Sequence, residues 1–325
     1  MLNFLKINGY AAYLYLPLFL LIFGAFAVSF SYNASVFEES ALYYFFTSVS
    51  NNISIKIAGL ILLLANVLLL DLLFTQQEVT EKFNHVPAFL FGILDCYVLI
   101  QNPLHPLLFA QLFVIGGLWQ YFSTYKANQS LSAGFDGAFM LSVASIIYPP
   151  LCLFLGLFVI CLLILRSFIL REWLLSLMGI TLPYMLYAAF LFLFGEKVQA
   201  IYTNIDVSFH HFIMPTLLKG SLLIYSIISL LILATIVFFL IRPISNNVKT
   251  RKTLSIFIWM FLLSIISWFT IDNGSIFVTW LSIIPLSLFI GTYLGNTKSR
   301  TFAEILLWIF LAAFVASILQ QENII

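Results

Sequence analysis

Long apolar stretches separated by short polar turns dominate this chain. The segment Leu131–Leu186 shows the pattern best, with three apolar stretches divided by the turn at Tyr148-Pro149-Pro150 and by the charged turn Arg166–Glu172. Each stretch is close to the ~20 residues that an α-helix needs to cross the hydrocarbon core of a bilayer. The alternating segments of ~10 residues that are typical of a membrane β-barrel do not occur. The pattern therefore predicts a bundle of transmembrane helices.

The same pattern along the whole chain predicts an all-α, polytopic membrane protein with about eleven transmembrane helices. An interfacial helix is also expected at Phe37–Ser48, where tyrosine and phenylalanine cluster beside two glutamates. The predicted transmembrane helices are Gly9–Phe30, Ile55–Phe74, Pro87–Gln101, one ending near Thr124, the three within Leu131–Leu186, Ser221–Ile241, Leu254–Ile271, one ending before Thr297, and Thr301–Leu319.

Composition supports this class and excludes others. Hydrophobic residues make up 62% of the 325 residues and charged residues only 8%, whereas a soluble domain carries roughly 25% charge. The formal net charge of +1 offers no basic surface for nucleic acid. Cys96, Cys152 and Cys161 all lie in apolar stretches, so neither a disulfide framework nor a zinc site is indicated.

Basic residues set the predicted orientation, because lysine and arginine stay on the cytoplasmic side of membrane helices. With the N-terminus inside and the C-terminus outside, every arginine falls in a cytoplasmic loop, and only Lys56, Lys197 and Lys219 lie outside. The chain is therefore predicted to be one membrane domain, 1–325, in the bacterial cytoplasmic membrane. It divides into helices one to seven at 1–195 and helices eight to eleven at 196–325.

Candidate chemistry on the predicted outer side consists of two loop glutamates and a set of basic residues. Glu38 and Glu39 could act as a catalytic base near a lipid-borne substrate, or they could form a solvated loop pair. The candidate substrate-binding residues can hydrogen-bond phosphate or carry positive charge, and the alternative for the histidines is an ordinary interfacial position. They are His105, His210, His211, Lys56 and Lys197.

Acidic residues inside predicted helices form the second set of candidates. An acid within a membrane is costly and is by default a functional hypothesis. Asp95 lies deepest, near the middle of the third helix, and is the best candidate for transport or for a packing switch. Asp136 lies nearer the inner surface, as does Glu304, which is interpreted as structural.

The charged turn itself supplies the third set. Arg166, Arg171 and Glu172 form a short cytoplasmic connection that anchors two helices. A functional alternative is a docking point for a protein partner or for anionic lipid headgroups.

Two resemblances follow from these residues. The segment LRSFILREWLLSLMGITLPYML resembles the signature of an uncharacterised family of bacterial polytopic inner-membrane proteins, with a pattern close to R-x-F-x-x-R-E-W followed by G-x-x-x-P. Residues 1–195 also resemble, more remotely, the amino-terminal module of GT-C glycosyltransferases. The matching features are the acidic first outer loop with Glu38 and Glu39, and a small-residue helix that closes on an aromatic residue, here Ala133, Gly134, Gly137 and Tyr148.

The second resemblance implies a GT-C-like protein that handles a polyprenyl-phosphate or other lipid substrate at the outer leaflet, as a glycosyltransferase or a degenerate relative. The chain differs from that family in three ways. Its candidate acids are glutamates, whereas the family usually has aspartate; outer arginines are lacking; and the large outer carboxy-terminal domain of many members is lacking. The alternatives are a non-catalytic subunit that scaffolds a cell-envelope assembly with protein partners, and a small-solute transporter that depends on Asp95. No cofactor follows from the residues, although a divalent cation is compatible with an enzyme.

Overall fold

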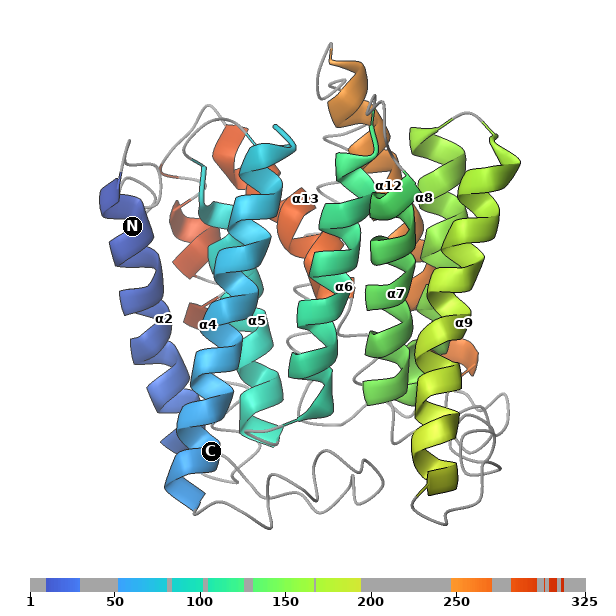
Figure 1. Ribbon diagram of the computed structural model, residues 1–325. Coiled ribbons are helices and arrows are strands. Elements are labelled where there is room, and N and C mark those ends of the chain that lie inside the picture. Colours follow the sequence, from blue (N-terminus) through green and yellow to red (C-terminus); the bar gives the residue numbers. More distant parts are fainter. Residues whose placement is uncertain are drawn as a thin grey trace.

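The computed structural model describes residues 10–29, 52–80, 84–101, 105–125, 131–166, 168–193, 247–270 and 282–296, with short pieces at 301, 304–308 and 311–312. Every element within these ranges is a helix, which confirms the predicted all-α class. The helices stand side by side in one bundle, with α2 and α9 at opposite edges (Figure 1). Helix α7 packs against α6 and α9, and α5 packs against α2, α4 and α13, so helices far apart in the sequence also pack together.

The described helices match the predicted ones closely in position. Their bounds are α2 Tyr10–Ser29, α4 Asn52–Gln76, α5 Val86–Gln101, α6 Pro106–Ser123, α7 Leu131–Ile147, η1 Pro149–Gly156, α8 Leu157–Leu165, α9 Leu170–Leu193, α12 Val248–Thr270 and α13 Ile283–Asn296. The predicted interfacial helix and the predicted helix at 221–241 lie outside the described residues.

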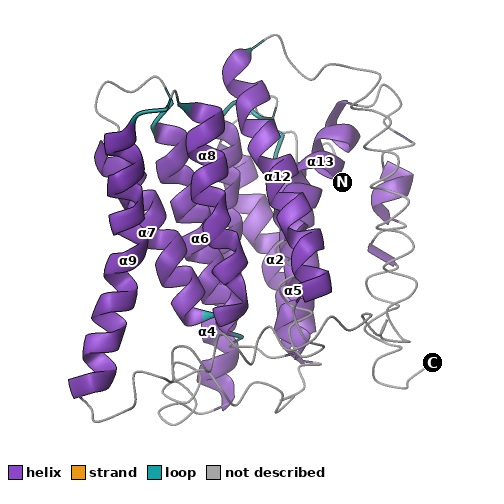
Figure 2. Cartoon of the chain, turned by 90° about the vertical axis from the view of Figure 1, so that its right-hand side faces the viewer, coloured by secondary structure: helices purple, strands orange, loops and turns teal. Residues whose placement is uncertain are grey.

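Four of these helices are long and apolar enough to cross a membrane, namely Ile53–Gln76, Pro106–Ser123, Leu170–Leu193 and Val248–Ser267. The exposed surface of helix α9 is strongly apolar. Met185, Phe192 and Leu193 expose 71%, 75% and 81% of their surface, and such a large apolar face indicates contact with lipid. Figure 2 shows α9 at the edge of the bundle, beside α7. The chain is therefore a membrane protein.

Two elements differ from the predicted ones in a way that has a physical cause. The sixth predicted helix begins as a 3-10 helix, η1, because Pro149 and Pro150 supply no backbone N–H for regular α-helical hydrogen bonds. Helix α12 begins at Val248 rather than at Leu254, so three basic residues that were expected in a loop belong to its first turns. Lysine and arginine are good helix formers, and their long side chains can reach the polar end of the bundle.

Lysine side chains of α12 bind the carboxyl ends of two helices. Lys249 Nζ donates to Gln76 O at 3.2 Å at the end of α4, and Lys252 Nζ donates to Leu165 O at 3.3 Å at the end of α8. Cations are stabilising at such helix ends, where carbonyl groups lack intrahelical partners. The end of the bundle that holds the last turns of α4 and α8 and the first turn of α12 is called the basic end below. It is the end that the sequence predicts to face the cytoplasm.

Helices α6, α7 and α9 pack through glycines. A Cβ atom added to Gly179 would lie 2.6 Å from Phe135 O, so the backbones of α9 and α7 are in direct contact. A Cβ atom added to Gly137 would lie 2.8 Å from the Tyr121 ring of α6. Small residues allow this close approach between membrane helices, where lipid provides little hydrophobic drive for association. Ser142 Oγ also donates to Ile180 O at 2.8 Å, beside the carbonyl of Gly179 that Pro183 cannot satisfy.

Candidate functional site

A buried cluster of three polar side chains joins α4, α5 and α6. Asn66, Asp95 and Gln111 come from these three helices in turn, and each is 0% exposed. Gln111 Nε2 donates to Asp95 Oδ1 at 3.0 Å. Asn66 Nδ2 lies 2.9 Å from Leu108 O and 3.4 Å from Gln111 Oε1, and it donates to both. The carboxyl group of Asp95 is thus fully enclosed and is bound by a side chain of another helix, while its predicted functional role stays a prediction.

The cluster has more acceptors than donors. Both donor hydrogens of Asn66 are used, and Gln111 supplies one to Asp95. Asp95 Oδ2 and Asn66 Oδ1 are buried without a hydrogen-bond partner among the described residues. Buried polar oxygens are paired in most proteins, and an unpaired one usually has a functional or strain-related cause. A proton on Asp95 Oδ2 would supply one further donor, so the arrangement can accept a proton without rebuilding the helices.

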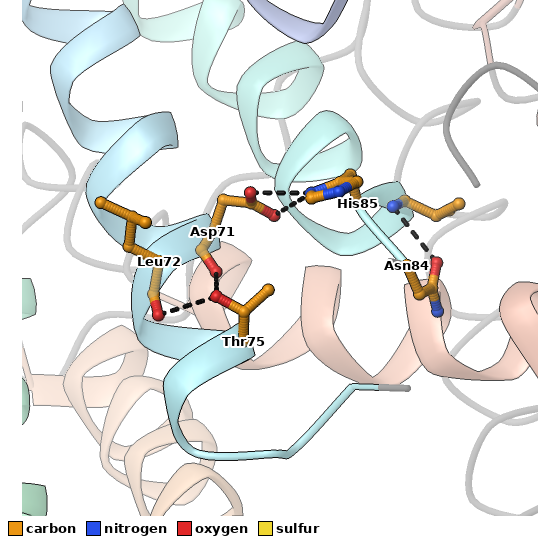
Figure 3. Close-up of polar contacts among 6 residues, drawn as sticks. Asp71, Leu72, Thr75, Asn84 and His85 are labelled. Carbon is orange, nitrogen blue, oxygen red and sulfur yellow. Dashed lines mark hydrogen bonds and ion pairs between the residues drawn. The ribbon is translucent and has the colours of Figure 1, made fainter. Parts of the chain in front are cut away.

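A second buried pair joins the end of α4 to the start of α5. His85 Nδ1 lies 2.8 Å and 3.0 Å from the two carboxylate oxygens of Asp71, as Figure 3 shows. The side chains are 4% and 3% exposed, respectively. Because the carboxylate accepts, Nδ1 carries the hydrogen, and the carboxylate fixes the orientation of the ring.

Residues next to this pair in the sequence make tight contacts with α12 and α13. Asn84 Oδ1 accepts from Val86 N at 3.3 Å and holds the entry into α5 (Figure 3). A Cβ atom added to Gly295 of α13 would collide with Asn84. Phe74, three residues after Asp71, meets the ring of Phe257 of α12 edge to face with centroids 5.6 Å apart. The Asp71–His85 pair is therefore covered by packed side chains instead of facing an open surface.

His105 occupies the opposite end of α6 from the basic end. It is the N-cap of α6, where its Nδ1 accepts from Leu107 N at 3.0 Å, and the hydrogen of the neutral ring is then on Nε2. Burial lowers the pKa of His105 to about 3, so the ring is neutral at physiological pH. Its ring meets that of Tyr148 with centroids 5.6 Å apart. The predicted role in binding substrate is not tested by this arrangement and stays a prediction.

Helix geometry orders these groups along the bundle. At 1.5 Å per residue, Asp95 lies ~15 Å along α5 from His85, and Gln111 lies ~9 Å along α6 from His105. Asn66 lies ~8 Å along α4 from Asp71. The Asp71–His85 pair is thus near the basic end, the Asn66–Asp95–Gln111 cluster is central, and His105 with Tyr148 lies toward the other end.

The structure places the other described candidate residues away from the two buried clusters and His105. Asp136 is exposed on α7. Lys56 Nζ donates to Val28 O at 3.1 Å at the end of α2, which is a helix-capping contact. Arg166 Nη2 donates to Glu172 Oε1 at 3.0 Å and ties the end of α8 to the first turn of α9, while Arg171 is exposed. The anchoring interpretation of the charged turn therefore has a direct contact behind it.

The remaining predicted site residues, which are Glu38, Glu39, Lys197, His210 and His211, lie outside the described residues. The glycosyltransferase interpretation depends on them, and it stays a prediction, as does its polyprenyl-phosphate ligand. Among the residues that are described, no three histidine, cysteine or acidic side chains are grouped so as to hold a metal ion.

Sequence reasoning missed four of the five residues that build the two buried clusters. Asp71 lies inside the second predicted helix, so the cost of burying an acid could have identified it in the same way as Asp95. Asn66 and Gln111 are amides within apolar stretches and carry a weaker signal of the same kind. His85 stands at the end of a polar loop, and nothing in its sequence position predicts burial.

Comparison with known proteins identifies the family of this chain but gives no information on its activity. No curated protein and no solved structure matches this chain. One family model does match, over residues 35–322, and these residues include every buried polar side chain described above. That match agrees with the predicted resemblance to an uncharacterised family and lends no support to the resemblance to GT-C enzymes. The chain belongs to the family described as Family of unknown function (DUF6427).

Proposed function

We propose that this protein moves protons through the membrane and that Asp95 is the central proton-binding residue. The observation that carries the proposal is the donor deficit at the Asn66–Asp95–Gln111 cluster, where Asp95 Oδ2 is fully buried and has no described partner. Ionisable residues inside membrane bundles commonly mark ion pathways and proton relays. This reading develops the small-solute transporter that the sequence suggests through Asp95.

The number of available oxygens favours a proton over a metal cation. Two oxygens, Asp95 Oδ2 and Asn66 Oδ1, are unpaired in the described cluster. Calcium requires six to eight oxygen ligands and magnesium an octahedral set of six. A proton needs a single acceptor, and on Asp95 it also removes the negative charge from a buried group.

Buried polar groups with exchangeable hydrogens lie on both sides of Asp95 and support a route. The Asp71–His85 pair lies toward the basic end, and His105 with Tyr148 lies toward the other end. The axial intervals of ~9–15 Å exceed one hydrogen bond, so proton transfer between these groups requires bridging water or side-chain movement.

Proton flux into vesicles tests the proposal. Purified protein is placed in potassium-loaded liposomes that contain a pH-sensitive dye. When valinomycin sets the membrane potential, the dye should report a change in the internal pH. Asp95→Asn keeps the shape and the bond from Gln111 but removes the proton carrier, so flux should fall by about 10²–10⁴-fold, the usual contribution of a positioned proton-transfer group.

The matched control is Asp136→Asn, which changes an exposed acid of α7 in the same way and should leave the flux unaltered. Equal flux in wild type and Asp95→Asn, or no flux above protein-free vesicles, would refute the assignment.

We also propose the finer topology, with about eleven spans, the N-terminus inside and the C-terminus outside. The basic end, where Lys249 and Lys252 bind carbonyl groups, supports a cytoplasmic assignment for that side. In a variant lacking Cys96, Cys152 and Cys161, cysteines at positions 275 and 321 should react with an impermeant thiol reagent in intact spheroplasts. Cysteines at 245 and 299 should react only after lysis, and labelling of 245 from outside would contradict the topology.

A further inference from the structure

We propose that Asp71 and His85 form a second proton-binding site, which exchanges protons between the basic end of the bundle and Asp95. The inference rests on the proposed function and names the group that supplies protons to Asp95. It assigns a role to two buried polar residues, Asp71 and His85, which are 2% and 3% exposed.

The geometry is that of a carboxylate that holds one face of an imidazole. His85 Nδ1 is within hydrogen-bond distance of both Asp71 oxygens, so the ring cannot turn without losing both contacts. The ring nitrogen that does not face the carboxylate is then Nε2. Carboxylate–imidazole pairs of this kind serve as proton acceptors because the carboxylate stabilises the imidazolium that forms.

Protonation is also the event that changes the charge of this enclosed site. With a neutral imidazole the pair carries one negative charge, and with an imidazolium it is neutral overall. A net charge is costly in a buried site, and the two side chains are only 4% and 3% exposed. A simple structural clamp would need no titratable group, because apolar side chains of similar volume stabilise a bundle at least as well.

The charged side chains described around the pair contact other groups. Glu78 Oε2 accepts from Asn247 at 3.1 Å, and Lys249 and Lys252 donate to the carbonyls of Gln76 and Leu165. These contacts engage partners other than Asp71 and His85. The remaining titratable side chains described on the elements packed around α4 and α5 are Arg251 of α12, Tyr15 of α2, Tyr293 of α13, and His105, Tyr121 and Tyr125 at or within the ends of α6.

His85→Asn separates a proton site from a clamp. The asparagine amide can still donate to Asp71 from the position of Nδ1, but it cannot bind a proton. In titrations of purified protein in nanodiscs over about pH 8 to 5, the range in which histidine changes charge, wild type should take up about one proton more than His85→Asn. Equal uptake would overturn the inference, whatever Asp95→Asn does to flux.

The same variant should slow proton flux in vesicles by about 10²-fold, as for removal of a proton-transfer group. Azide, a small diffusible weak acid, should restore flux in His85→Asn by delivering protons to Asp95, and it should not restore Asp95→Asn. A loss that azide does not rescue would identify a clamp and refute the inference. If uptake differs by one proton while Asp95→Asn conducts normally, the second site stands and the proposed function fails.

Discussion

Arg166→Met is expected to lower the free energy of unfolding by about 3 kcal/mol. Arg166 Nη2 donates to Glu172 Oε1 at 3.0 Å, and the two side chains are only 17% and 7% exposed. Methionine keeps the length of the side chain but leaves Glu172 without its counter-ion in a buried position. Breaking such a pair costs about 3–5 kcal/mol, and the lower figure applies because the N-terminus of α9 still stabilises an acid in its first turn.

Unfolding in mixed micelles with increasing SDS measures this effect. Arg171→Met changes the neighbouring exposed arginine and should stay within about 0.5 kcal/mol of wild type. The double variant Arg166→Met/Glu172→Leu should recover most of the lost stability, since no unpaired charge remains. A full loss in the double variant would show that the arginine acts through packing of its stem and not through the charge pair.

Asp95→Leu/Gln111→Leu is expected to fold with at least wild-type stability while proton flux falls by about 10²–10⁴-fold. The two leucines replace a carboxyl and an amide that contact each other at 3.0 Å in a fully buried place. Replacing a buried polar or charged pair by apolar side chains is neutral or stabilising by about 1–4 kcal/mol. Stability and activity should therefore change in opposite directions, which is the behaviour of a site retained for function.

The single variant Gln111→Leu provides the matched comparison. It leaves Asp95 without its described donor, so it should be less stable than the double variant by about 1–3 kcal/mol, the cost of an unsatisfied buried group. SDS unfolding and vesicle flux measure the two properties on the same preparations. Wild-type flux in the double variant would remove Asp95 from the proton route, and a large loss of stability would show that the cluster mainly holds α5 to α6.

The helices were predictable because their signal is local. A continuous apolar stretch such as α4 or α6 forms a helix in lipid, because its backbone polar groups must be hydrogen-bonded within the segment. The start of α12 was not predictable in this way, because Lys249 and Lys252 look like loop residues until the carbonyls of α4 and α8 are placed beside them.

The candidate site was predictable only in part, because its members come from different helices. The cost of burying an acid identified Asp95, but its dependence on Gln111 is a matter of how α5 and α6 are rotated against each other. His85 gives the clearest case, since its partner Asp71 comes from another helix and its neighbour Asn84 contacts Gly295 of α13, far along the chain. The hydropathy of a segment indicates whether a helix lies in lipid. It does not indicate which other helix each of its faces contacts.

The glycine contacts between α6, α7 and α9 also restrict how the protein can move. Gly179 rests on the carbonyl of Phe135, and Gly137 rests on the Tyr121 ring, so sliding or rotating one helix against the next would drive side chains into backbone atoms. Close-packed seams of this kind move as one rigid body. Any opening that gives water access to Asp95 is therefore expected to occur by tilting this three-helix block against α4 and α5, with the hinge at the contact between α4 and α6.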